Sequence, residues 1–284
     1  MRLSELGEFG LLAELERRGL AHRIGDDAAR LRGGLVVTQD ALVEDVHFRL
    51  DWTSWRDLGY KAAAVNVSDL SASAARPFAL VVSLGAPPDT RLEDVLELYE
   101  GLNEAGVEIV GGDTTRAERL YLSVTALGRA ARVPGRAGAV PGDLLVVTGP
   151  LGGSGAGYRS LRDGVESPLV ASHLRPPLRV EEGLALGAAA HAMIDLSDGL
   201  APDAGHIAAR SGCRLAIDLG RVPRAGELAD LGFGEDYELL AATPDPLDFT
   251  VIGRCEEGEG VELRLEGELV ELAGWEHFRR WSDR

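Results

Sequence analysis

The chain has 284 residues, 45% of them hydrophobic, with 36 glycines and a formal net charge of −17. This composition provides a sizeable core for one large domain or two smaller ones, and the glycines between apolar runs exclude disorder and collagen-like structure. The negative charge argues against a nucleic-acid-binding protein and against electrostatic binding to anionic lipid, because both partners require a basic surface.

The first half of the chain alternates between strand-like and helix-like segments. The clearest is Arg91–Ala105, where apolar residues recur on one helical face and Gly106 supplies a C-terminal stop. The predicted elements, in chain order, are strand Leu35–Val37, helix Trp55–Leu70, strand Phe78–Leu84, helix Arg91–Ala105 and strands Val107–Val110 and Leu120–Leu127.

The segment Gly128–Gly142 is rich in Arg, Ala, Gly and Pro, and indicates either a boundary between two halves or a long functional loop. We expect domains at residues 1–130 and 131–284. A second strand–helix series follows, so the chain indicates two α/β halves. Its predicted elements are strand Leu144–Val147, helix Leu178–Ala190, strand Ala192–Ile194, a helix from Asp198 to about Arg210, and short strands from Tyr237 onward.

Acidic clusters recur along the chain, and in most of them a carboxylate follows or interrupts an apolar run beside Gly, Ser or Thr. Apolar flanks draw such a residue inward, where a lone anion is costly unless it is neutralised, hydrogen-bonded or bound to a cation. The clusters are GDDA (25–28), TQD (38–40), VSDL (67–70), GGDTT (111–115), IDLSDG (194–199) and GEDYEL (234–239).

Asp, Thr, Gln and backbone carbonyls are hard oxygen ligands that suit Mg²⁺ together with phosphates. Several such groups in one cleft would suit a nucleoside triphosphate, so we interpret the acidic strand end after Leu35–Val37 as part of a metal–phosphate site. An Asp before Gly is also common in turns and N-caps, and Ser197-Asp198-Gly199 fits that alternative. Recurrence at the ends of many apolar runs favours the metal site.

Weaker motifs leave their alternatives open. VTGPLGGSGAGY follows a strand with P-loop spacing between Gly152 and Gly157, but Tyr158 stands where that motif needs Lys, so a tight strand–helix turn is favoured. His206 lies three residues after Asp203, a spacing typical of capping or packing. His47, near the end of the first acidic segment, is equally compatible with a substrate contact and with none.

The two cysteines, Cys213 and Cys255, lack the spacing of a metal motif and are predicted to be reduced, partly buried thiols. No N-terminal apolar segment resembles a signal peptide, and no apolar run approaches the ~20 residues that span a bilayer. We therefore expect a cytoplasmic protein without a membrane partner.

In their order, these motifs resemble those of the thiamine-monophosphate kinase family, in the aminoimidazole ribonucleotide synthetase-like ATP-binding superfamily. The resemblance runs from Gly7 to about Leu240, with a weaker match in GWEHF (274–278). Sister enzymes such as aminoimidazole ribonucleotide and selenophosphate synthetases are the alternative, and a non-catalytic metal-binding protein is a remote one. The motifs typical of the thiamine-phosphate enzymes are GEFGLL, VHF, GGDTTR and GEDYELL.

The resemblance implies a two-domain α/β (α+β) fold in which the N-terminal domains of a homodimer pair into a β-barrel-like core. The N-terminal domain would bind ATP and metal, and the C-terminal domain would complete the ATP and substrate site. The implied reaction is ATP-dependent phosphorylation of thiamine phosphate to thiamine diphosphate, by direct in-line transfer of the γ-phosphate. Its implied cofactor is Mg²⁺, as several ions, with ATP as co-substrate.

Matching positions of the resemblance carry the implied site residues. Three of the metal ligands, Asp40, Asp69 and Asp198, would be catalytic. The implied metal ligands are Asp27, with Asp26 beside it, Thr38, Gln39, Asp40, Asp69, Asp113, Asp195 and Asp198. The implied ATP contacts are Tyr99, Gly112, Asp113, Arg136 and Ser197, and the implied thiamine-phosphate contacts are His47, Glu235 and Trp275.

Three departures from the family pattern bear on the site. TQD replaces the common TTD, so Gln39 can offer only a carbonyl or amide oxygen. SDLSASAA replaces SDLAAMGA, which puts the backbone after Asp69 in question but keeps the ligand. The stretch from Ala216 to Gly234 is short, so part of a substrate lid is expected to be reduced.

Overall fold

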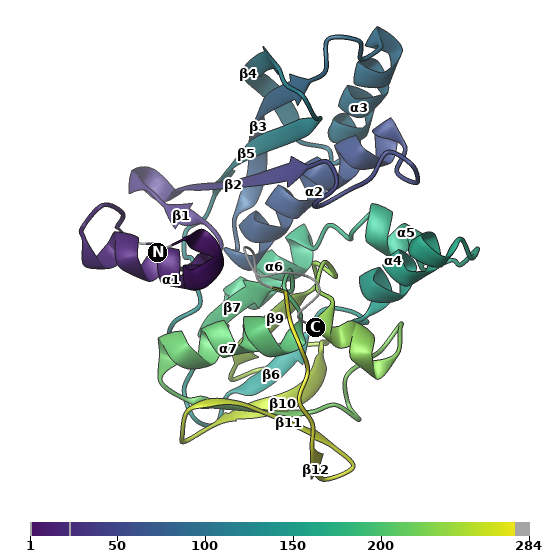
Figure 1. Ribbon diagram of the computed structural model, residues 1–284. Helices are drawn as coiled ribbons and strands as arrows, with labels where there is room; N and C mark the ends of the chain where they lie inside the picture. Colours follow the sequence, from purple (N-terminus) through teal and green to yellow (C-terminus); the bar gives the residue numbers. More distant parts are fainter. Residues whose placement is uncertain (1, 23, 276–284) are drawn as a thin grey trace.

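The computed structural model describes residues 2–22 and 24–275, which form two open sheets with helices packed around them (Figure 1). A five-stranded sheet has the order β1-β2-β5-β3-β4, and a seven-stranded sheet has the order β12-β11-β8-β10-β6-β9-β7. The first sheet ends with β5 at Arg129 and the second begins with β6 at Leu144. We call the parts around these sheets the N-terminal and C-terminal halves.

In the N-terminal half, burial alternates along the strands, so only one face of the sheet is covered. Along β5, every second residue from Leu122 to Gly128 is buried, which is the period of a half-buried strand. β2 pairs with β5 and β5 with β3 in antiparallel fashion, while β3 and β4 run parallel. The strands are β1 (Ala29–Arg30), β2 (Leu35–Val43), β3 (Arg76–Ala86), β4 (Glu108–Arg116) and β5 (Tyr121–Arg129).

Two helices cover this sheet, α2 (Trp55–Ala72) and α3 (Leu92–Glu104). They cross at backbone contact because a Cβ on Gly59 would lie 1.9 Å from the Leu98 oxygen, and one on Gly101 would lie 1.9 Å from the Arg56 oxygen. α2 is buried along most of its length and packs against α6 and β7 of the other half. Its C-terminal end therefore lies where the two halves meet.

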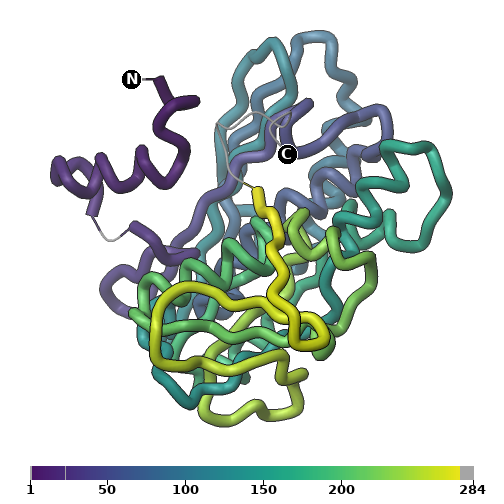
Figure 2. The backbone as a smooth tube through the Cα atoms, turned by 60° about the horizontal axis from the view of Figure 1, so that its bottom comes forward, coloured from purple at the N-terminus to yellow at the C-terminus, as the bar shows by residue number. Residues whose placement is uncertain are grey.

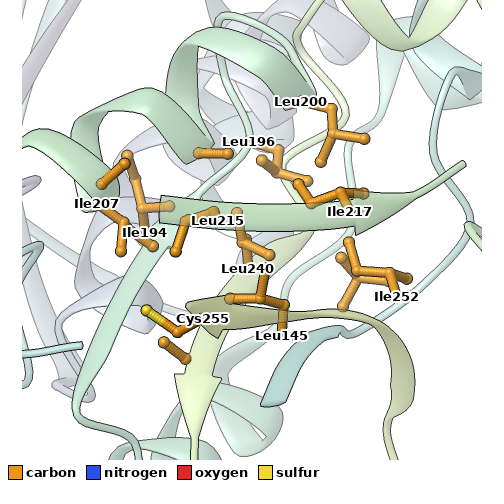
Figure 3. Packing of buried hydrophobic residues seen from close by; sticks show 14 of the residues in the cluster. Leu145, Ile194, Leu196, Leu200, Ile207, Leu215, Ile217, Leu240, Ile252 and Cys255 are labelled. Atoms are coloured by element: carbon orange, nitrogen blue, oxygen red, sulfur yellow. The ribbon is translucent and has the colours of Figure 1, made fainter. Parts of the chain in front are cut away.

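In the C-terminal half, helices pack against the seven-stranded sheet, and a large apolar core lies between them (Figure 3). Its strands are β6 (Leu144–Val147), β7 (Ala192–Asp195), β8 (Arg214–Asp218), β9 (Leu239–Thr243), β10 (Thr250–Glu256), β11 (Gly260–Leu265) and β12 (Glu268–Leu269). Its helices are α4 (Gly153–Asp163), α5 (Val170–Leu174), α6 (Val180–Gly187), α7 (Leu200–Ser211) and the 3-10 helix η2 (Leu228–Gly232).

The two cysteines lie inside this core. Cys213 and Cys255 are free thiols, both buried, with their sulfurs 2.8 Å apart. Burial raises the pKa of Cys255 to about 12, so this sulfur is held as an unreactive thiol. They are more deeply buried than the sequence predicts.

The N-terminal helix projects from the molecule, whereas the described C-terminal segment runs back along its surface (Figure 2). Helix α1 (Leu3–Arg17) projects from the body of the molecule, and its backbone is not helical at Gly7. It contacts α7 through Phe9 and His206, whose ring centroids are 4.8 Å apart. The 3-10 helix η1 (Arg32–Gly34) leads into β2. After β12 the chain returns to the junction of the halves, where the Trp275 N–H bonds to the Asp198 oxygen.

Most predicted elements are present, with informative errors in their limits. The two predicted N-terminal helices match α2 and α3 within two residues. The strand predicted to end at Val37 continues to Val43, because it pairs with β5 along its whole length, so TQD lies within a strand. GGDTT likewise lies inside β4. The helix predicted from Asp198 begins at Leu200, and the prediction lacks α1, β1, α4, α5 and β8.

Among the described helices, none combines the length and apolar character needed to cross a membrane.

Candidate functional site

Three carboxylates from distant parts of the chain meet where the halves join. Asp27 comes from the turn before β1, Asp69 from the C-terminal end of α2, and Asp195 from the end of β7. One oxygen from each lies within 4.8 Å of the other two. We call Asp27, Asp40, Asp69 and Asp195 the acidic cluster, since the charge of Asp40 on β2 repels those of Asp27 and Asp69.

Neighbouring polar groups fix the orientation of these carboxylates. The Thr38 hydroxyl lies 2.5 Å from Asp69 Oδ2 and 3.0 Å from the backbone oxygen of Asp27. Ser68, one residue before Asp69, donates to Asp195 Oδ2 at 2.6 Å. The backbone N–H of Asp40 donates to Asn66 Oδ1 at 3.0 Å. Strand β2 and helix α2 therefore hold the cluster from both sides.

The acidic cluster is short of positive charge. Burial, followed by repulsion from Asp27, raises the pKa of Asp40 to about 6 and that of Asp195 to about 8. Burial also raises the pKa of Asp69 well above its usual range, and the charges of Asp40, Asp195 and Asp27 add to it. Arg136 pairs with Asp27 at 2.6 Å, yet burial still raises the pKa of Asp27.

Such a site must take up protons or cations, and its donors suit one kind of cation. Carboxylate and hydroxyl oxygens are the ligands that Mg²⁺ prefers, and Mg²⁺ commonly shares them with substrate phosphates. The residues present therefore fit Mg²⁺. Burial and mutual repulsion raise these pKa values, and a bound cation would oppose both effects, so the groups that hold protons are also suited to bind a cation.

Asp203 and His206 behave as the capping and packing interpretation predicts. Asp203 accepts the backbone N–H groups of Asp198 and Gly199, each at 3.0 Å, at the start of α7. Burial lowers the pKa of His206 to about 4, and its ring packs on Phe9. Oxygen and nitrogen atoms of Asp198, Asp203 and His206 also lie within 4.8 Å of one another, and the capping and packing contacts account for Asp203 and His206 in this group.

Some residues implied as ligands lie elsewhere in the described chain. The side chain of Gln39 bonds to Ser123 and Thr125 of β5, on the opposite sheet face from Thr38 and Asp40. Asp113 on β4 pairs with Ser83, so it shares the face of Gln39 and is exposed.

Two implied ATP contacts are also remote from the acidic cluster within this chain. Gly112 lies beside Asp113 on edge strand β4, three strands away from β2. Tyr99 lies on α3, which packs against the N-terminal part of α2, whereas Asp69 is at the other end of that helix. Arg136, in contrast, pairs with Asp27 of the cluster, and Ser197 follows Asp195 by two residues.

A second group of buried charges centres on Glu235. Lys61 Nζ and His173 Nδ1 lie 2.9 Å and 3.2 Å from Glu235 Oε2. Burial pushes the pKa of Glu235 upward, but the charge of Lys61 and its hydrogen bond oppose burial, and the pKa lies below its usual range. His47 lowers the pKa of Glu235 slightly further, and its Nδ1 accepts the backbone N–H of Val43 at 3.1 Å.

These geometries can be compared with known proteins. Residues 25–130 match the family described as AIR synthase related protein, N-terminal domain, and residues 140–263 match its C-terminal domain. Thiamine-monophosphate kinase of Aquifex aeolicus is 38% identical, covering 98% of this chain and all of the relative. That of Mycobacterium tuberculosis H37Rv is 39% identical, covering 97% of this chain and 93% of the relative.

The chain belongs to the thiamine-monophosphate kinase family.

A solved structure, AaThiL complexed with AMPPCP and TMP, superposes with a TM-score of 0.89 at 38% identity, covering 98% of this chain and 99% of that one. A HypE structure in complex with ATP superposes with a TM-score of 0.72 at 21% identity, covering 94% of each chain, and shows the shared fold alone. The thiamine-monophosphate kinase family is thus matched in both sequence and structure.

In the GEDYEL motif, which is typical of thiamine-monophosphate kinases, Asp236 and Glu238 make contacts that the sequence analysis does not predict. Asp236 accepts the N–H groups of Gly152 and Ser154 at 2.7 and 3.1 Å, so a carboxylate of this chain occupies the glycine-rich turn and the tight-turn interpretation fits. Glu238 pairs bidentately with Arg179 at 2.7 and 2.6 Å.

The sequence did contain a signal for one missed residue. Lys61 lies in GYKAAAV, a helix that is apolar nearly all round, and a charged residue in such a helix requires a buried partner. That partner is Glu235, 174 residues away. Of the implied substrate contacts, Glu235 is held by Lys61, and the backbone N–H of Trp275 donates to the backbone oxygen of Asp198.

Proposed function

We propose that this protein transfers the γ-phosphate of ATP to thiamine phosphate at the acidic cluster, giving thiamine diphosphate and ADP. The observation that carries the proposal is the convergence of Asp27, Asp69 and Asp195, short of positive charge, in a member of the thiamine-monophosphate kinase family. The related structure solved with AMPPCP and TMP supports both substrates.

The chemistry requires positioning and charge compensation more than acid–base catalysis. The attacking oxygen of thiamine phosphate is largely deprotonated at neutral pH, since its second pKa is about 6 by analogy with phosphorylated side chains. A general base and a covalent nucleophile are then unnecessary. Mg²⁺ held by Asp27, Asp40, Asp69 and Asp195 would reduce repulsion between the two polyanions and stabilise charge on the equatorial oxygens.

Several residues of this chain would orient the reactants. Arg136, anchored by Asp27, would face the phosphates of ATP, and Ser197 would lie near the nucleotide. Glu235, His47 and Trp275 would contact thiamine phosphate. Asp198, three residues after Asp195, would add a further metal ligand. Their shared location at the junction of the halves supports these roles.

We further propose a homodimer formed through the five-stranded sheet, with domains at residues 1–130 and 131–284. Three strand spacings, about 14 Å in total, separate β4 from β2, so Gly112 and Asp113 would serve the site of a second copy. Support comes from β4, exposed along nearly its whole length, and from Phe78 and Val110, which are 42% and 57% exposed. Pairing of two such sheets would produce the barrel-like core.

An ADP-release assay tests the reaction. Purified protein with Mg²⁺ and ATP should release ADP when thiamine phosphate is added, and this release should stop when EDTA removes the Mg²⁺. The sister-enzyme alternative predicts ADP release with aminoimidazole ribonucleotide precursors instead, and the metal-binding alternative predicts none. We expect the protein to act in the cytoplasm, where Cys213 and Cys255 would remain thiols.

A further inference from the structure

Lys61 is the most deeply buried charged group of the N-terminal half. Its side chain is 1% exposed, on a helix surrounded by apolar residues, and its Nζ lies 2.9 Å from Glu235 Oε2. A buried ion pair seldom stabilises a fold better than apolar packing would, because both charges must leave water. The pair therefore calls for a reason other than stability, and Glu235 remains 20% exposed at the junction of the halves.

The contacts of Glu235 are unevenly divided between its two oxygens. Among described residues, Lys61 and His173 both approach Oε2, at 2.9 and 3.2 Å, and leave Oε1 for another donor. Burial, then Lys61, lowers the pKa of His173 to about 3, so this ring is neutral. Lys61 and Glu235 cancel, and the group has no net charge. Glu235 is thus an ionised hydrogen-bond acceptor rather than a spare counter-charge for a cation.

The backbone presents Glu235 in a costly conformation. Gly234, Glu235 and Tyr237 have φ of 87°, 56° and 52°, in the left-handed region that non-glycine residues rarely adopt. The backbone N–H groups of Glu235 and Tyr237 donate to the backbone oxygens of Ser197 and Leu196, at 2.8 and 2.9 Å, and these bonds hold the segment in that conformation. Such strain, fixed by its surroundings, is typical of residues that meet a ligand.

Aromatic rings stand beside this acceptor. His173, which contacts Glu235, has its ring 5.6 Å from Tyr158 and 5.9 Å from Phe233, and Tyr158 stacks on Phe233 at 4.9 Å. Trp52 from the N-terminal half meets Tyr158 edge-on at 6.3 Å. An ionised acceptor next to aromatic rings matches a flat heteroaromatic ring that carries an N–H donor.

We propose that Lys61, with neutral His173, positions Glu235 to accept a hydrogen bond from the exocyclic amino group of the aminopyrimidine ring of thiamine phosphate. Lys61 is then a positioning residue that determines substrate specificity through Glu235. The inference rests on the proposed function and adds to it the part of the substrate that this group recognises.

The first test separates positioning from general damage. Lys61→Met should raise the KM for thiamine phosphate about 30-fold, with the KM for ATP unchanged and kcat lowered less than threefold. Glu235→Gln should raise the same KM, and adding Lys61→Met to it should change the KM less than twofold further, because Lys61 acts only through Glu235. Effects that multiply in the double variant would overturn the proposal.

The second test uses thiamine phosphate that lacks the pyrimidine amino group. A site that hydrogen-bonds a substrate N–H strongly rejects the analogue without it, so the wild type should favour the natural substrate at least 100-fold in kcat/KM. Lys61→Met should reduce this preference below about fivefold. If Lys61→Met fails to fold, the near-isosteric Glu235→Gln gives the same readout. An unchanged preference in the variant that folds would refute the idea.

A matched control and the wild type complete the design. Arg159→Met removes another ion pair next to Tyr158, that with Asp230, and should leave the preference for the amino group unchanged. If the wild type releases no ADP with thiamine phosphate, the proposed function fails, and this inference falls with it. If the wild type is active but Lys61→Met keeps its preference, only the inference fails.

Discussion

Two groups of buried carboxylates lie at the same junction and differ in how their charge is balanced. In the acidic cluster, burial and mutual repulsion raise the pKa values of Asp40, Asp69 and Asp195. At Glu235, burial acts in the same direction, but Lys61 opposes it and the pKa is lowered. Similar burial thus gives opposite results, because Lys61 compensates the single carboxylate of Glu235 whereas Arg136 alone faces several carboxylates.

This difference indicates which group is complete without a ligand. Glu235 needs nothing further to remain charged, so it can act as a fixed part of a recognition surface. The acidic cluster has only Arg136 as a partner for several carboxylates, so it is unfinished until cations arrive. Changes that disturb the unfinished group should affect catalysis, and changes that disturb compensated pairs should affect stability or recognition.

The largest effect is expected from Asp69→Asn. Asp69 is central to the acidic cluster, and its loss should lower kcat by at least about 10³-fold, about 4 kcal/mol of transition-state stabilisation. The fold should remain intact, because removing one repelling charge relieves the cluster, so the Tm in EDTA should be unchanged or higher. Steady-state ADP release and thermal unfolding measure the two quantities.

A control defines what that loss means. Asp89→Asn changes an exposed carboxylate outside the cluster and should leave kcat unchanged. Asp69→Asn retaining more than about a tenth of wild-type turnover would contradict the role of the acidic cluster in phosphoryl transfer.

The acidic cluster is easier to predict from the sequence than the Glu235 group. Asp69 and Asp195 follow apolar segments, which place them near the ends of buried elements, and ends of neighbouring elements meet, whereas Asp27 lies in the turn before β1. The sheet face on which a strand residue lies was harder to predict. Side chains alternate between the two faces along a strand, so Gln39 and Asp113 point away from the cluster. No local pattern reveals that Lys61 meets Glu235, since that contact depends on how the halves pack.

The next largest effect is expected for a pair compensated within the fold. Arg179→Met leaves Glu238, which is buried, without its bidentate partner. Breaking such a pair leaves an uncompensated buried charge, so the free energy of unfolding should fall by about 3 kcal/mol. Urea unfolding measures this loss. A fall below about 0.5 kcal/mol would show that Glu238 finds another partner and that compensation here is unimportant.

The pH dependence of stability should separate the two groups further. Asp40 and Asp195 have folded pKa values of about 6 and about 8, above the 3.8 of an unperturbed Asp. Between about pH 4 and 8 the folded state therefore binds more protons than the unfolded state, and stability without metal falls as pH rises. The Tm in EDTA should be lower at pH 8 than at pH 5.5.

Magnesium should reverse that trend. Because Mg²⁺ binds the deprotonated carboxylates, 10 mM Mg²⁺ should raise the Tm more at pH 8 than at pH 5.5. In Asp69→Asn this difference should shrink, whereas in Lys61→Met it should persist, since Lys61 belongs to the compensated group. An equal Mg²⁺ effect at both pH values would argue against binding at the acidic cluster.

The smallest effect is expected from Ser68→Ala, and it tests the cluster without removing a carboxylate. The Ser68 hydroxyl donates to Asp195 at 2.6 Å and favours its charged form, against the burial that raises its pKa. Losing about 1 kcal/mol of that support should raise the Mg²⁺ concentration for half-maximal activity about fivefold at pH 7.

The same change should lose its effect when Asp195 is already ionised. At pH 9, above the pKa of about 8, the proton no longer competes with Mg²⁺, and Ser68→Ala should approach wild-type behaviour. Ser71→Ala is the matched control, because Ser71 is buried on the same helix but donates to the Val67 oxygen. A shift of equal size at both pH values, or an equal shift in Ser71→Ala, would mean that Ser68 acts through helix α2 rather than through the charge of Asp195.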